Sequence, residues 1–393
     1  MTGPGRIHIR AHGLRRWHRW GGLIALLFLL IAAISGSLLV YKKGLIRLLV
    51  TLDASLPANF TPYDMAPQLD RIARTIAEEK RDRIKAPNWE EPYWTLTGIN
   101  GSVQLLAVDS LESYQNNRWL LECFSFLRQL HTELLSSLIG ETVLLASGIL
   151  GLFLCGTGLI LWWPTRHGFR WRWVMPRPVR VSFLLHYHRH VGALTTLTVM
   201  LVILTGSVML WQKLVRPILP PVAVSTLPKP IENPSTLAPS QLLSTALEAI
   251  PDGWPTHIRL KSTGGMEANF RFRLPGEWHA NGRTSITIHT TTGEVSVSSR
   301  SDQAPPVRKL LNRLYPLHSG YGMTTLYTLL VVVSGVALAW LAVTGGLSYL
   351  KRFSFKVFRE PSIGSEISKI DSYYRVTHGS ETRVNRDRES SAR

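Results

Sequence analysis

Cysteine is scarce in this chain, with only Cys123 and Cys155 among 393 residues. Two thiols are too few for a cysteine-based metal site or an iron–sulfur cluster, and no Cys-x-x-Cys-His run allows covalent c-type haem attachment. Cys155 falls in an apolar run and Cys123 in a polar stretch, so we expect no disulfide between them. Any metal chemistry therefore needs other ligands.

Acidic residues are also few, because 26 Asp and Glu stand against 44 Lys and Arg and give a formal net charge of +18. The excess does not indicate nucleic-acid binding, since no basic patch is interleaved with residues that could read bases. Hydrolase motifs are missing too: His-Glu-x-x-His does not occur, and no Ser or Thr beside His lies in a nucleophile-elbow context. A protease or hydrolase has no support.

Charge is absent from the centres of four long apolar runs, Leu23–Tyr41, Thr142–Trp163, Ala193–Trp211 and Leu326–Leu350. Each run is long enough to cross a hydrocarbon core of about 30 Å as a helix. Helices are expected because lipid offers backbone groups no hydrogen-bond partner. The first run is too long for a signal peptide and lacks an Ala-x-Ala end, so we interpret it as a retained helix. The sequence predicts a membrane α-helical fold with four transmembrane helices.

The basic residues predict the orientation of these helices. Five arginines precede the first run and six separate the second from the third, with no acidic residue in either segment, and four more basic residues follow the fourth run. These segments share one side, which should be cytoplasmic, with both termini there. The predicted plan is a cytoplasmic N-terminus (1–20), a first helix (21–41), an outer domain (42–133), a second helix (134–163), a cytoplasmic loop (164–192), a third helix (193–213), a second outer domain (214–323), a fourth helix (324–350) and a cytoplasmic tail (351–393).

Both outer loops show one helix followed by strands. In the first, Asp64–Lys80 has helical spacing and two strands flank a turn at Asn100–Gly101, while Trp119–Leu130 is amphipathic. In the second, a helix at Pro239–Ile250 precedes four strand-like runs. The predicted strands are Tyr93–Ile99, Val103–Asp109, His257–Lys261, Ala268–Arg273, Thr284–His289 and Glu294–Ser298. We therefore expect a small α+β unit used twice.

Histidines lead into every predicted membrane helix. His18 precedes the first, and His186, His188 and His190 precede the third, all at the cytoplasmic side. His131 precedes the second helix and His318 the fourth, both at the outer side. A haem iron with two axial histidines needs one imidazole on each face of the ring, and ligands at equal depth on neighbouring helices supply this. The alternative to a haem ligand is a histidine that only forms hydrogen bonds at the membrane interface.

Several motifs resemble those of one family, the PepSY-associated transmembrane proteins. The run His18–Leu23 is similar to the His-Arg-Trp-x-Gly-Leu that opens the family, and Thr157–Pro164 to its Thr-Gly-x-x-x-Trp-Trp-Pro. His188–Gly192 resembles the His-Arg-x-x-Gly before the third helix, and Leu317–His318 belongs to the fourth-helix pattern. The resemblance covers roughly residues 14 to 352, and the two outer loops resemble PepSY-type extracytoplasmic domains.

The resemblance implies an iron-regulated inner-membrane protein of Gram-negative bacteria, similar to di-haem reductases that pass electrons to a ferric siderophore in the periplasm. Carried over, His18 and His188 would ligate the cytoplasmic haem, and His131 and His318 the periplasmic one, as two haems of b type. His186 and His190 lie one helical turn apart, and either could replace His188. The expected partners are a ferric siderophore, an electron donor of unknown identity, other iron-uptake proteins and the lipid bilayer.

Two further interpretations compete with the reductase. The outer domains could bind a periplasmic partner in iron uptake without catalysis, with the helices as a membrane anchor. A transporter is less well supported, because no intramembrane charge or broken helix pair marks a substrate path. Replacing His131 and His318 distinguishes a relay from an anchor, because only a relay should lose activity.

Overall fold

The computed structural model describes residues 4–79, 81–98, 101–174, 183–215, 236–260 and 266–357. Four helices in these ranges are long and apolar enough to cross a membrane: α1 (Pro4–Val40), α5 (Ser137–Trp162), α6 (Leu184–Val215) and α9 (Thr325–Val357). They coincide with the four predicted runs, so that prediction is confirmed. The chain is a multi-pass membrane protein. Most of the predicted C-terminal tail, from residue 358 on, lies outside the described residues.

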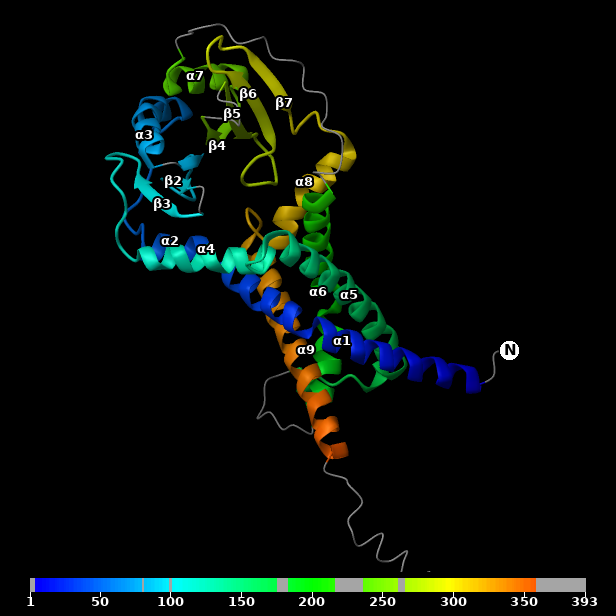
Figure 1. Ribbon diagram of the computed structural model, residues 1–393. Coiled ribbons are helices and arrows are strands. Elements are labelled where there is room, and N and C mark those ends of the chain that lie inside the picture. The colour runs from blue at the N-terminus through cyan, green and yellow to red at the C-terminus, as the bar shows by residue number, and fades with distance from the viewer. Residues whose placement is uncertain are drawn as a thin grey trace, which may run out of the picture.

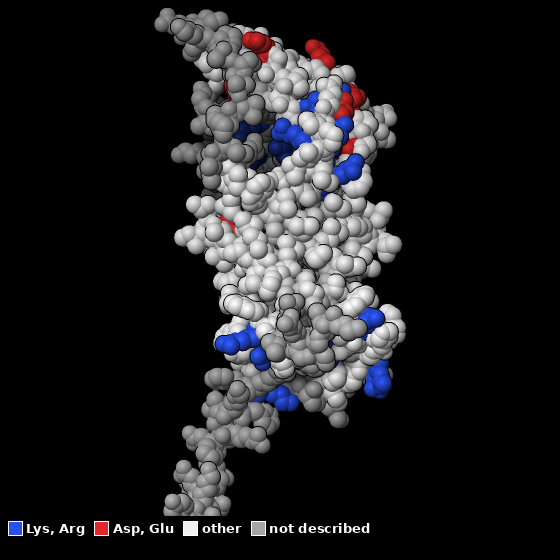
Figure 2. All heavy atoms as spheres, turned by 90° about the vertical axis from the view of Figure 1, so that its right-hand side faces the viewer, with Lys and Arg blue, Asp and Glu red and all other residues white. Residues whose placement is uncertain are grey.

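The surface of the helical part fits a lipid environment. On the face drawn in Figure 2, a band nearly free of charged side chains separates the soluble part from a group of Lys and Arg at the opposite end. On the spanning helices, large apolar side chains such as Leu197 and Leu326 are 71% and 77% exposed. Such exposure would be unfavourable in water but is expected against hydrocarbon.

The four spanning helices form a bundle in which α1 and α6 are diagonal to each other. Helix α1 packs against α9 and α5, and α6 packs against the same two helices. Small residues allow close contact, since Gly151 lies against side chains of Leu29 and Ile203. Val199, Ile203 and Ala337 form a buried cluster between α6 and α9. The bundle therefore brings residues of α1 and α6 toward a shared interior.

Three shorter helices cover the end of the bundle nearest the sheet, which we call the outer end. Helices α2 (Lys42–Leu49) and α4 (Arg118–Glu133) lie side by side beneath the sheet, and α8 (Pro306–Ser319) leads into α9 (Figure 1). Ile46, Leu121 and Phe124 bury the contact between α2 and α4. Helix α4 confirms the amphipathic prediction, whereas α2 and α8 were not predicted. Short 3₁₀ turns occur at Pro62–Asp64, Trp163–Gly168 and Trp171–Trp173.

The described residues of the two outer loops form one antiparallel sheet with the strand order β3-β2-β1-β4-β5-β6-β7. Six of its strands fall within a few residues of the predicted ones, while β1 was not predicted. Its strands are β1 (Arg81–Lys85), β2 (Tyr93–Gly98), β3 (Val103–Ala107), β4 (Trp254–Arg259), β5 (Glu267–Arg273), β6 (Thr284–His289) and β7 (Val295–Ser299).

Each of the two loops contributes a helix and strands, as predicted, but their strands join into one sheet and do not form two separate domains. Strand β1 of the first loop pairs with β4 of the second, with Ile84 opposite Ile258 and Lys85 opposite His257. An unpaired β1 and β4 would each leave an open row of backbone donors and acceptors, and joining them removes both edges. The loops therefore build a single soluble part over the outer end of the bundle.

One face of the sheet is covered by helices and the other is polar. Helices α3 (Met65–Glu79) and α7 (Pro239–Ala249) pack on the first face, where Leu69, Leu243 and Phe270 lie in the core (Figure 1). Side chains alternate along a strand, so Phe270 and Phe272 of β5 are buried while Arg271 points to the opposite face. That polar face is turned toward α2 and α8.

Candidate functional site

Two histidines meet inside the bundle at the end remote from the sheet. His18 of α1 and His188 of α6 have ring centroids 6.3 Å apart, with the rings at 84° to each other. Nδ1 of His18 lies 2.8 Å from Oγ1 of Thr157 on α5. Nδ1 of His188 lies 3.1 Å from the carbonyl oxygen of Leu341 and 3.2 Å from Oγ1 of Thr344 on α9. All four spanning helices thus contribute to this inner pair.

A second pair lies at the outer end of the bundle. His131 near the end of α4 and His318 near the end of α8 have ring centroids 6.0 Å apart, at 34° to each other. Nδ1 of His131 is 3.0 Å from the carbonyl oxygen of Ala32, and Nδ1 of His318 is 2.9 Å from that of Val202. The outer histidines therefore come from short helices outside the spans, which rest on α1 and α6, and not from the spanning helices themselves.

Each histidine is held by a hydroxyl residue followed by glycine on a spanning helix. Ser35, Thr157, Thr205 and Thr344 each donate their hydroxyl proton to the carbonyl four residues earlier, at 2.6–2.8 Å. The hydroxyl oxygen can then only accept at the nearby Nδ1, as the backbone carbonyls do. Nδ1 must therefore carry the ring proton, which leaves the Nε2 lone pair of all four imidazoles for a ligand.

The glycine beside each hydroxyl residue gives the ring room. A Cβ on Gly36 would lie 2.7 Å from Cε1 of His131, and one on Gly206 would lie 2.7 Å from Cε1 of His318. At the inner pair the corresponding distances are 3.3 Å, from Gly158 to His18 and from Gly345 to His188. The structure thus places each of these four Ser/Thr-Gly pairs against a histidine.

The spacing of these residues repeats along the chain. His18 precedes Ser35 by 17 positions, and His188 precedes Thr205 by 17. His131 precedes Thr157 by 26 positions, and His318 precedes Thr344 by 26. The halves α1–α4–α5 and α6–α8–α9 are therefore equivalent, and each half holds histidines of both pairs. This signal was available from sequence and was missed because the histidines were compared only by depth.

The alternatives to His188 take other positions. His186 is exposed and stacks on Trp173, with ring centroids 4.9 Å apart. His190 is buried, packs against Phe169 and has its Nδ1 2.7 Å from the carbonyl oxygen of His186. Both line a pocket of about 260 Å³ at the inner end of the bundle. The pocket is enclosed by Trp162, Thr165, Gly168, Arg170, Arg172, Trp173, His186, Arg189 and His190.

The outer pair is neutral near pH 7. Burial lowers the pKa of His131 to about 4, and the neighbouring His318 contributes in the same direction. Burial also lowers the pKa of His318. Neutral imidazole is the form that binds a metal. Throughout the described ranges no three His, Cys, Asp or Glu side chains gather as a metal site. Each pair of facing imidazoles could therefore hold a metal ion through two nitrogen ligands.

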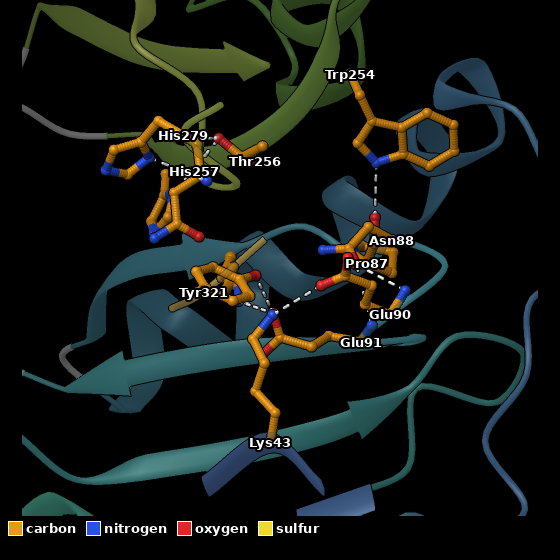
Figure 3. Close-up of polar contacts among 12 residues, drawn as sticks. Lys43, Pro87, Asn88, Glu90, Glu91, Trp254, Thr256, His257, His279 and Tyr321 are labelled. Atoms are coloured by element: carbon orange, nitrogen blue, oxygen red, sulfur yellow. Dashed lines mark hydrogen bonds and ion pairs between the residues drawn. The ribbon is translucent and has the colours of Figure 1, made fainter. Parts of the chain in front are cut away.

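Neither Cys123 nor Cys155 forms a disulfide, as expected from the sequence. Three further histidines lie in the soluble part. His289 has a structural role, because its Nδ1 accepts hydrogen bonds from the backbone of the turn at Thr291 and Thr292. His257 and His279 lie close together near Tyr321 (Figure 3).

Comparison with known proteins agrees with this architecture. No curated protein matches the chain. The model of the PepSY-associated TM region matches residues 15–352, which include all four spanning helices, both histidine pairs and every strand. Since the match covers most of the sequence, the chain belongs to the family of membrane proteins with a PepSY-associated transmembrane region.

Proposed function

We propose that this protein is a haem-containing membrane reductase that passes electrons through the bilayer to a ferric siderophore and releases ferrous iron. The observation that carries the proposal is the pair of imidazoles at each end of the bundle, with ring centroids 6.3 Å and 6.0 Å apart. His18 and His188 would hold one b-type haem, and His131 and His318 the other.

The separations fit a metal between two imidazoles. The ring centroids, 6.3 Å and 6.0 Å apart, leave room for a metal ion between the two imidazoles of each pair. The hydrogen bonds at Nδ1 fix the tautomer and increase the basicity of Nε2. Bound haem would supply reversible one-electron chemistry, and the protein would set its potential through these ligands and their burial.

The spanning helices set the path length. Along α1, His18 and the Ser35 that holds His131 are 17 residues apart, and α6 repeats this spacing. At 1.5 Å per residue the two sites are about 25 Å apart, slightly less than the hydrocarbon thickness of about 30 Å. One site would therefore lie near each surface of the membrane, so that an electron entering at one surface can leave at the other.

In this proposal the soluble part would bind the electron acceptor, a ferric siderophore. Hydroxamate, catecholate and carboxylate oxygens are hard ligands that suit ferric iron, and reduction weakens their hold on the metal. The sheet and α8 lie over the outer pair, so a chelate docked there would be close to His318. Ferrous iron would then leave without destruction of the chelator.

The arginine-rich segments favour one orientation in a bacterial inner membrane, with both termini cytoplasmic. The pocket formed by Arg170, Arg172, Arg189 and Trp173 would then face the cytoplasm beside the inner pair. Its cationic lining suits an anionic group of the electron donor. This role would also explain why His186 and His190 line the pocket instead of joining His18.

Haem content tests the proposal. Purified protein should contain two b-type haems per chain in a pyridine haemochrome assay, and dithionite should produce the bands of six-coordinate haem. His18→Ala or His188→Ala should remove one haem, and His131→Ala or His318→Ala the other. His186→Ala is the matched control and should retain both. A chain without haem, with full biological activity after loss of His131 and His318, would instead support a membrane-anchored binding protein.

A further inference from the structure

The loop between α5 and α6 borders the pocket at the inner end of the bundle. The 3₁₀ turn Trp171–Trp173 packs against α6, and the space between them measures about 260 Å³. We call this space the inner pocket. Three of its lining residues are arginines, Arg170, Arg172 and Arg189. Its volume is several times the roughly 30 Å³ that one water occupies in the liquid, so it can hold a polyatomic group.

The three arginines reach the inner pocket from two elements, Arg170 and Arg172 from the loop and Arg189 from α6. Nη2 of Arg189 donates a hydrogen bond to Oγ1 of Thr165 at 2.6 Å, and the guanidinium carbon of Arg172 lies 5.2 Å from the centre of the Trp173 ring. Within the described ranges none of the three forms an ion pair. A guanidinium has five N–H donors, so one hydrogen bond leaves most of those of Arg189 for a ligand.

The helices and loop around the inner pocket contain no carboxylate that could balance these charges. The sequence has no Asp or Glu at positions 1–52, 142–231 or 303–359, which include the inner halves of all four spanning helices. On the face drawn in Figure 2, the coloured side chains at this end are all Lys or Arg. Like charges held close together repel each other, so a bound anion would stabilise the pocket.

The number of cationic groups favours phosphate over carboxylate as this anion. A carboxylate carries one charge on two oxygens and can be satisfied by a single guanidinium fork. A phosphate group offers three or four oxygens and up to two charges, and guanidinium groups match its geometry. Three arginines around one space therefore fit a phosphate group and part of the molecule that bears it.

The tryptophans near the inner pocket indicate that it lies at the membrane surface. Trp162 and Trp173 line it, and Trp163 and Trp171 beside them are 58% and 64% exposed. Tryptophan is enriched where a membrane meets water, at the level of the lipid headgroups. Basic pockets between transmembrane helices on the cytoplasmic side bind such headgroups. A phosphate group can thus reach the inner pocket on a lipid or on a soluble compound.

From these observations we propose that the inner pocket is a phosphate-binding site, in which Arg170, Arg172 and Arg189 hold the phosphate group of a lipid or of a soluble phosphate ester. Arg189 directly follows His188 on α6, so the phosphate would lie beside the inner histidine pair. Phosphate binding does not require haem. Only the use of the site to dock an electron donor rests on the proposed function, and it would make the anionic group of that donor a phosphate.

Inorganic pyrophosphate tests binding of a soluble phosphate compound. We expect calorimetric titration of the full chain, in nanodiscs of the zwitterionic lipid phosphatidylcholine, to show binding that weakens as salt is added. Arg170→Gln combined with Arg172→Gln should lower the affinity at least about tenfold, the effect of one charge-assisted hydrogen bond. Both side chains are exposed, so the double variant should fold normally.

Phosphatidylglycerol, which carries a net negative charge, tests binding of a lipid phosphate. If the lipid fills the site, native mass spectrometry should show one phosphatidylglycerol retained per chain in preference to phosphatidylcholine, and nanodiscs of phosphatidylglycerol should suppress pyrophosphate binding. If a soluble compound fills it, no lipid should be retained and pyrophosphate should bind equally in both nanodiscs. Either result supports a phosphate site and identifies its source.

Arg166→Gln is the matched control for the double variant. Arg166 belongs to the same loop but lies over the ring of Trp163 and does not line the inner pocket, so its loss should change neither measurement. The proposal is overturned if neither pyrophosphate nor phosphatidylglycerol binds, or if the double variant binds them as the unchanged chain does. Haem content of the same samples reports on the reductase proposal, so the two ideas can fail separately.

Discussion

At the scale of single residues, the protein repeats one arrangement four times. It consists of an imidazole, a hydroxyl group that accepts a hydrogen bond from Nδ1 of the ring, and a glycine next to Cε1 of the ring. The hydroxyl is itself held in place, because it donates a hydrogen bond to a carbonyl in the preceding helical turn. For Thr157, Oγ1 lies 2.8 Å from the carbonyl oxygen of Phe153. Fixing the ring through Nδ1 leaves Nε2 as its only free nitrogen. In the proposed haem sites, the orientation of each histidine would therefore depend on residues that do not touch the metal.

The glycines give a test of this unit. Gly36→Ala and Gly206→Ala would place a Cβ 2.7 Å from Cε1 of His131 and His318, so each ring must shift. We expect either variant to lose most of the outer haem and keep the inner one, measured as haem per chain. Gly158→Ala and Gly345→Ala should have milder effects, because the distance is 3.3 Å.

Gly156→Ala is the matched control for these variants, since nothing lies within 4 Å of its added Cβ. It should bind haem like the unchanged protein. Full haem content in Gly36→Ala and Gly206→Ala would show that the glycines do not position the rings.

At the scale of elements, Glu91 joins the sheet to the membrane bundle. It follows β1, where it contacts Lys85, and it also contacts Lys43 of α2 and Tyr321 just before α9. Burial alone would raise the pKa of Glu91, but Lys85 and Lys43 outweigh it and lower the pKa to about 2. The contacts of this carboxylate with two lysines and a tyrosine hold the sheet in position relative to the membrane bundle.

The pH dependence of the soluble part follows from the sign of this shift. A pKa of about 2 in the folded protein, below the ordinary value of 4.5, means that ionised Glu91 stabilises the fold fully above about pH 4.5. That stabilisation is lost as pH falls toward 2. Melting followed by the β-sheet signal in circular dichroism should show a falling transition temperature across this range.

Glu91→Gln should remove much of this acid sensitivity and lower the transition temperature at neutral pH. Breaking a buried ion pair costs about 3 kcal/mol, or roughly 10 °C for a part of this size. The control Glu112→Gln changes an exposed carboxylate in the same soluble part and should melt normally. An unchanged profile for Glu91→Gln would mean that Glu91 does not hold the junction.

The elements that sequence predicted and those it missed differ in a physical way. The spanning helices are marked by long apolar runs without central charge, and six strands carry an alternating signal, such as the buried Ala268, Phe270 and Phe272. Strand β1, with Arg81, Arg83 and Lys85, has one apolar residue and no such signal. Its conformation depends on pairing with β2 and β4, and β4 comes from the other loop. The depth of each histidine in the membrane could be predicted from its distance along the chain to the next apolar run. Its hydrogen-bond partners could not, because they lie on other helices and depend on how the bundle packs.

At the scale of the whole molecule, the two halves are tied together at both ends. Each histidine pair takes one ring from each half, and the sheet joins the halves through β1 and β4. Parallel repeats related by an axis along the membrane normal are a known way of building sites at a repeat interface. Neither histidine pair could be completed by half of the chain alone.

Crosslinking tests this joined architecture without reference to haem. Lys85 and His257 are direct neighbours across β1 and β4, where antiparallel partners have Cβ atoms about 4.5–5.5 Å apart, close to disulfide range. In a background with Cys123→Ser and Cys155→Ser, the variant Lys85→Cys with His257→Cys should oxidise within one chain and shift its mobility on a non-reducing gel. The pair Lys85→Cys with Ser285→Cys lies on the same sheet but three strands apart, so it should stay reduced. Absence of crosslinking of the near pair would mean that the two loops fold as separate units, whereas efficient crosslinking of the distant pair would mean a different order of strands in the sheet.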